Sequence, residues 1–126
     1  MVVLFQNWIA FAAIDTIKLS RLSNKNQNKK GIKNVVCGNI GDPLINYVDV
    51  SIDTIIILEI SSFQLERIKY LSPYISVITN ITPNHLDRHT FDEYINIKKR
   101  IYLNTSLNHY LVINKDTYQK YNINPN

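Results

Sequence analysis

The chain has 126 residues, the usual size of a single domain, with 45% hydrophobic and 19% charged residues. This composition supplies enough apolar side chains for a core and excludes a chain that is disordered throughout. The formal net charge of +4 is mild. The single cysteine, Cys37, excludes an intrachain disulfide and a cysteine-ligated metal cluster.

The N-terminal third divides into an apolar stretch and a polar one. Residues 1–22 are mostly apolar and predict a buried or amphipathic helix. The uninterrupted apolar part is shorter than the roughly 20 residues of a transmembrane helix, and it lacks the basic start of a signal peptide. We therefore expect a cytoplasmic protein. The stretch "NKNQNKKGIK" (24–33) predicts a solvated linker, with nucleic-acid binding as the alternative interpretation.

A strand, a turn and a short helix are predicted next. "NVVC" (34–37) has β-type composition, and the following "GNIGDP" contains the turn residues Gly38 and Gly41. Asp42 and Pro43 predict the N-cap and the first residue of a short helix in "PLINYV".

Three continuous aliphatic runs follow: "DTIIILEI" (53–60), "YISVITNI" (74–81) and "HYLVIN" (109–114). They lack the alternation of a half-exposed strand and predict strands buried on both faces. "FDEYINIKKRIYLN" (91–104) predicts a helix whose apolar stripe contains Tyr94, Ile97 and Ile101, with either Lys98 or Tyr102. Strands alternating with helices predict an α/β fold, a partial parallel sheet flanked by helices.

Polar residues gather where two of these strands end. Glu59 closes the run 53–60, and residues 80–85 follow the next strand. Ligands of parallel sheets bind at the carboxyl ends of the strands. A carboxylate directly after four aliphatic residues is costly to bury unless it is paired or binds a cation. This edge of the sheet is therefore the predicted site.

Four blocks in the sequence carry a family resemblance: "CGNIGDPL", "LEISSFQLE", "ITNITPNHLDRH" and "YINIKKRIY". In order and spacing they resemble the central domain of the Mur ligases, and "SSFQLE" is most similar to the D-glutamate-adding branch. The resemblance assigns 34–126 to part of that domain. Residues 1–33 resemble nothing in the family and form a separate N-terminal segment and linker.

The resemblance implies an ATP-dependent ligase of peptidoglycan synthesis. In such an enzyme ATP phosphorylates the carboxylate of UDP-N-acetylmuramoyl-L-alanine, and the amine of D-glutamate attacks the acyl phosphate. Mg²⁺ is the implied metal cofactor, since charge neutralisation dominates phosphoryl transfer.

The resemblance also implies residue roles. Glu59, His85 and a carbamylated Lys98 match the catalytic and magnesium-binding positions of the family. Three further residues match substrate-binding positions: Asn39, Ser61 and Gln64. Taken without the resemblance, these residues have plainer interpretations. Glu59 is then a strand-end carboxylate held by backbone donors, His85 and His89 are loop histidines, and Lys98, Lys99 and Arg100 are solvated lysines and arginine of a helix.

The sequence departs from the family pattern in two respects. It contains three glycines and no Gly-Lys pair, so it holds no P-loop for the phosphates of ATP. The family also usually has aspartate where this chain has Asn84. We therefore expect a ligase fragment that is inactive alone and whose retention of ATP is doubtful, with the N-terminal segment covering an exposed sheet edge. Two alternatives remain open: a split enzyme completed by a P-loop-bearing partner chain, and a small basic binding protein.

Overall fold

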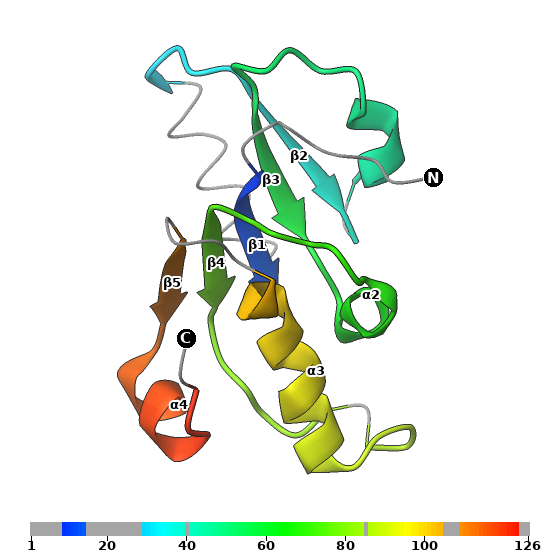
Figure 1. Cartoon of the computed structure of the whole chain (residues 1–126), viewed down its shortest axis with the longest axis vertical. Coiled ribbons are helices and arrows are strands. Elements are labelled where there is room, and N and C mark those ends of the chain that lie inside the picture. The colour runs from blue at the N-terminus through cyan, green and yellow to red at the C-terminus, as the bar shows by residue number, and fades with distance from the viewer. Residues whose placement is uncertain (1–8, 15–28, 40, 85, 105–108, 124–126) are drawn as a thin grey trace.

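The protein is an α/β structure built on one parallel sheet (Figure 1). The computed structural model describes residues 9–14, 29–39, 41–84, 86–104 and 109–123. The strands are β1 (Ile9–Ile14), β2 (Asn34–Gly38), β3 (Ile55–Glu59), β4 (Ile75–Ile78) and β5 (Tyr110–Ile113). Their order across the sheet is β2-β3-β1-β4-β5, and every neighbouring pair is parallel. The expected fold class is confirmed.

The N-terminal segment contributes the central strand. β1 pairs with β3 on one side, where Ala13 is in register with Glu59, and with β4 on the other, where Ile14 is in register with Ile78. The predicted helix over residues 1–22 is therefore wrong for residues 9–14, and these residues do not cover an edge of the sheet. The physical reason is that β3 and β4 do not pair with each other, and a six-residue apolar run completes both ladders.

The predicted short helix after β2 is present but begins later than expected. It is the 3₁₀-helix η1 (Leu44–Tyr47), and Pro43 precedes it in extended conformation. Asp42 is not its N-cap; the Asp42 backbone oxygen accepts a hydrogen bond from Gly38 N (2.9 Å), and its carboxylate accepts one from the Tyr47 hydroxyl (2.9 Å). This bond raises the pKa of Tyr47. The turn is thus fastened to the end of β2.

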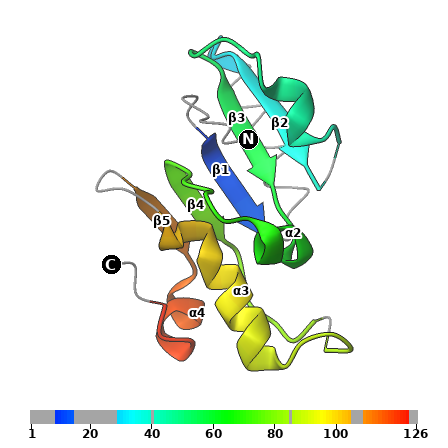
Figure 2. The ribbon, with the colours of Figure 1, turned by 45° about the vertical axis from the view of Figure 1, so that its right-hand side comes forward.

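The sheet is accompanied by the α-helices α2 (Ser62–Arg67), α3 (Phe91–Leu103) and α4 (Lys115–Lys120). Both views place α2 beside α3, and α4 after β5 (Figures 1 and 2). α3 packs on β4, where the Ser76 hydroxyl donates to the Ile101 carbonyl (3.0 Å). Within the described residues, no helix is long and apolar enough to cross a membrane.

The core lies between the sheet and α2 and α3. It contains side chains from β2 and α2, from the aliphatic runs 53–60 and 74–81, and from the predicted helical stripe: Cys37, Ile56, Leu58, Ile60, Leu65, Ile78, Tyr94, Ile97, Ile101 and Tyr102. The run 109–114 forms a strand, but its predicted burial on both faces is wrong: β5 is an edge strand of the described sheet, with Tyr110 and Val112 exposed. The stripe prediction is confirmed, and Lys98 and Tyr102 are both buried. Full burial of one such apolar side chain contributes about 1.5–3 kcal/mol, so these contacts hold α3 against the sheet.

A capping box begins α3. Thr90 N donates to Glu93 Oε2 (2.8 Å), and Glu93 N donates to Thr90 Oγ1 (3.3 Å). The hydrogen bond from the Thr90 backbone lowers the pKa of Glu93 below its usual value.

This capping box predicts a pH effect. A carboxyl whose pKa is lowered by folding contributes stability that is present above its unfolded pKa of about 4.3 and is lost as the pH falls through the folded value. Acidification is therefore expected to weaken the start of α3. The Glu93→Gln variant, which keeps an acceptor without a titrating group, should show less loss of unfolding free energy between neutral and acidic pH in urea titrations. Equal acid sensitivity of the two proteins would contradict the assignment.

Candidate functional site at the carboxyl ends of the strands

The ends of β2 and β3 lie side by side. Gly38 is in register with Glu59, and Asn39 N donates to the Glu59 backbone oxygen (2.8 Å). The Glu59 residue is 3% exposed, whereas Asn39 is exposed. The structure therefore brings together two of the residues that the sequence singled out, one buried at the strand end and one facing solvent.

Gly38 makes this approach possible. Its φ of 115° lies in the region that favours glycine. A Cβ at this position would collide with the Glu59 backbone oxygen and stand 2.7 Å from Leu58 Cδ1. A side chain here would push β2 away from β3 and displace Asn39 from Glu59.

Ser61 and Gln64 bind each other at the start of α2. Ser61 N donates to Gln64 Oε1 (2.9 Å), and Gln64 N donates to Ser61 Oγ (3.3 Å), which forms a capping box. The Ser61 hydroxyl also donates to Gln64 Oε1 (3.2 Å). Both residues thus stabilise the first turn of α2. Because the capping box uses the amide oxygen of Gln64, the amide nitrogen is the group of this side chain that we consider for a ligand.

Lys98 is buried on α3. The residue is 1% exposed, and Nζ stands 4.9 Å from the centroid of the Tyr94 ring, within cation–π range. The interpretation of Lys98 as a solvated lysine is wrong. Burying an ammonium group is costly, so this position is unusual for a lysine with only a structural role.

The residues described fit a magnesium site in part. Glu59 supplies a buried carboxylate, which is the oxygen ligand that Mg²⁺ prefers. Lys98 fits only as a carbamate, because an ammonium repels a cation. His85 lies outside the described residues. Within the described part of the chain, no group of three or more His, Cys, Asp or Glu side chains is placed to hold a metal ion.

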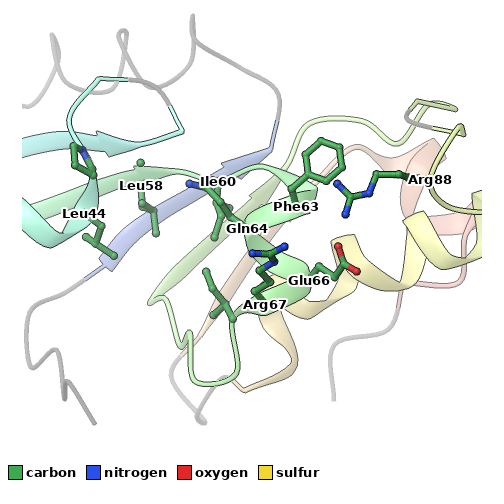
Figure 3. A pocket seen from close by; sticks show the side chains of 11 residues that line it. Leu44, Leu58, Ile60, Phe63, Gln64, Glu66, Arg67 and Arg88 are labelled. Carbon is green, nitrogen blue, oxygen red and sulfur yellow. The ribbon is translucent and has the colours of Figure 1, made fainter. Parts of the chain in front are cut away.

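A pocket of about 560 Å³ opens beside this edge (Figure 3). Its apolar wall comes from β3, η1 and α2, and its charged side chains come from α2 and the loop before α3. The lining residues are Gly38, Pro43, Leu44, Leu58, Ile60, Phe63, Gln64, Glu66, Arg67, Ile68 and Arg88. Of the residues predicted from sequence, Gln64 lines the pocket. An apolar cavity with a few polar groups is the usual form of a small-molecule site.

Contacts at the pocket join α2 to the loop before α3. The Arg88 guanidinium lies 5.0 Å from the centroid of the Phe63 ring. His89 Nε2 stands 3.7 Å from Glu66 Oε2, too far for a hydrogen bond but close enough for attraction when the imidazole is protonated.

Apart from Gln64, the pocket residues of α2 were not predicted from the sequence. Ser61 and Gln64 have the Ser-x-x-Gln spacing of a capping box, which predicts a helix start. Continuing that helix would have placed Phe63 and Arg67 on neighbouring turns of one face.

Two other features do not add to this site. Only residues 29–33 of the basic stretch are described; there Lys33 Nζ pairs with Asp53 Oδ2 (3.0 Å), and its hydrogen bond lowers the pKa of the exposed Asp53. Burial, followed by the nearby Asp42, raises the pKa of Cys37 to about 11. Cys37 is therefore a neutral core thiol rather than a nucleophile.

Comparison with known proteins identifies the family. The sequence profile of the Mur ligase middle domain matches residues 44–125. The chain belongs to the Mur ligase middle domain family. This match covers β3, α2, β4, α3, β5 and α4, and the observed parallel sheet is consistent with it.

Curated relatives of this Mur ligase domain are UDP-N-acetylmuramoylalanine--D-glutamate ligases. The protein from Caldicellulosiruptor saccharolyticus is 55% identical over 91 residues, which are 70% of this chain and 20% of the relative. The protein from Thermoanaerobacter sp. is 54% identical over 88 residues (68% and 19%), and that from Clostridium botulinum is 49% identical over 90 residues (70% and 19%). The chain spans about a fifth of the length of these relatives. The resemblance seen in the sequence is confirmed.

Proposed function

We propose that this chain carries one edge of the reaction centre of an ATP-dependent ligase that joins D-glutamate to UDP-N-acetylmuramoyl-L-alanine. The main support is the Glu59–Asn39 contact beside a pocket that Gln64 lines, because it joins residues from two separate family motifs at the carboxyl edge of one parallel sheet. The relatives that bear this activity are about half identical to the chain over the matched stretch.

The proposed roles follow the chemistry of each group. Glu59, His85 and a carbamylated Lys98 are the groups that would hold Mg²⁺. The ion, when bound, supplies charge neutralisation for the phosphoryl oxygens. Asn39, exposed next to Glu59, offers an amide to a substrate oxygen.

The proposed substrate contacts lie on α2 and at the pocket. The Ser61–Gln64 capping box fixes the start of α2 and holds the Gln64 side chain by its amide oxygen, and Gln64 lines the pocket, so its amide nitrogen is the proposed substrate contact. The apolar wall of the pocket lowers the local dielectric beside the reacting groups, which strengthens their electrostatic interactions.

A chimeric enzyme tests this proposal. The 91 matched residues of this chain would replace the aligned stretch of the Caldicellulosiruptor saccharolyticus ligase, which supplies the remaining four-fifths of a ligase. The chimera is expected to form ADP only with both substrates present, at a rate within about tenfold of the parent, or about 1.4 kcal/mol in activation free energy. The same chimera with Glu59→Ala is the control. A chimera that unfolds cooperatively but is no more active than this control contradicts the proposal.

The isolated chain is the second arm of the same assay. We expect it to form no ADP with both substrates, because the sequence holds no Gly-Lys loop to bind the phosphates of ATP. Activity restored by adding a P-loop-bearing partner chain would instead favour a split enzyme.

A further inference from the structure

Helix α2 is too short to be stable by itself. It has six residues, whereas isolated helices shorter than about 12–15 residues are marginal in water. Its start is fixed by the Ser61–Gln64 capping box. Its end must therefore be fixed by groups from elsewhere in the fold.

Arg100 of α3 binds the end of α2. Nη1 donates to the Glu66 backbone oxygen (2.8 Å), and Nη2 donates to the Ile68 backbone oxygen (2.8 Å). Ile68 is the C-cap, and its N–H returns to Gln64 O (3.2 Å) and Leu65 O (3.3 Å). The guanidinium thus neutralises the negative end of the helix and satisfies carbonyls that have no partner inside it. The interpretation of Arg100 as a solvated residue is wrong.

Arg100 stands two residues after Lys98 on the same helix. Side chains two positions apart on an α-helix are related by a rotation of about 200° around the helix axis, so they point to nearly opposite sides. Lys98 is accordingly buried, while Arg100 is half-buried and reaches α2. One helix therefore carries the buried lysine and also holds the segment that presents Gln64.

We propose that Arg100 is a positioning residue that sets α2, with Ser61 and Gln64, relative to α3, with Lys98. The roles of these three residues rest on the proposed function; the contact of Arg100 with α2 does not. Two divergent donors in one plane are a property of guanidinium that an ammonium does not reproduce, so lysine at this position loses the paired geometry.

Hydrogen exchange on the full chain tests the contact. In Arg100→Lys, the Leu65 and Ile68 amides are expected to exchange about tenfold faster or more, since charge-assisted hydrogen bonds are lost at that end of α2. The amides of Ile57 and Val77, in the sheet, should change by less than about twofold after correction for global stability. Lys99→Ala is the matched control on the neighbouring residue and should leave all four amides unchanged. Equal acceleration at all four amides overturns the proposal. Arg100→Gln gives the same comparison if Arg100→Lys does not fold.

Activity separates positioning from simple stabilisation. In the chimeric ligase, Arg100→Lys is expected to lower kcat about tenfold or more at a temperature where the protein is fully folded. Ile101→Val, which lowers stability through the core, should leave kcat within about twofold. Faster exchange in α2 with unchanged kcat overturns a positioning role. If the chimera without these substitutions is inactive, the proposed function fails. The hydrogen-exchange experiment then decides the role of Arg100: faster exchange that is confined to the α2 amides supports it, and faster exchange throughout the fold overturns it.

Discussion

Gly38→Ala is expected to lower the free energy of unfolding by about 2–6 kcal/mol. The positive φ alone costs about 1–3 kcal/mol for a residue with a side chain. The new methyl group adds a collision with the Glu59 backbone and with Leu58 Cδ1, and overpacking of this kind costs about 1–3 kcal/mol more. Urea titrations of both proteins measure the change. We also expect Asn39 and Glu59 to separate, because β2 must shift away from β3.

Gly31→Ala is the matched control. Gly31 also has a positive φ, of 69°, but a Cβ there would meet no atom within 4 Å. Only the conformational cost applies, about 1–2 kcal/mol. Similar losses at the two glycines would show that close approach at the strand ends does not matter.

Lys98→Met is expected to lower the activity of the chimeric ligase at least 100-fold while leaving it folded. Methionine fills much of the lysine volume without a charge, so the change in stability should stay within about 1.5 kcal/mol. Methionine cannot be carbamylated, so the proposed anionic group is lost. Removing a single group that stabilises charge in a transition state commonly costs about 10²–10³ in rate.

Lys99→Met is the control for this substitution, because Lys99 is the next residue of α3 and is half-buried. It should leave activity within about twofold, as expected of a residue outside the site. Equal loss of activity at both lysines would point to a general effect of helix charge instead of a role for Lys98.

Local patterns in the sequence predicted much of the fold. The aliphatic runs predicted the strands β3, β4 and β5, and β3 and β4 are buried as continuous apolar runs predict. β5 lies at an edge of the described sheet and exposes Tyr110 and Val112. The stripe of Tyr94, Ile97 and Ile101 gave α3, since side chains three and four apart share one face. Both signals depend only on near neighbours in the chain.

The same kind of signal failed for β1. "IAFAAI" is a short apolar run without period, and periodicity cannot distinguish a buried strand from a buried helix in such a run. The decision came from β3 and β4, whose inner edges are completed by this strand. The N-terminal segment was predicted to cover an edge of the sheet, but its residues 9–14 form the central strand instead.

Some features of the candidate site also follow from local sequence, whereas others depend on tertiary contacts. The sequence by itself determined that Glu59 ends a buried strand and that Lys98 lies on an amphipathic helix, because the local period fixes both positions. Only the tertiary structure decided that Lys98 is buried, that Arg100 reaches a helix end 34 residues earlier, and that Gly38 lets two strand ends meet. These features depend on contacts between segments far apart in the chain, and such contacts form only when the sheet and helices pack together.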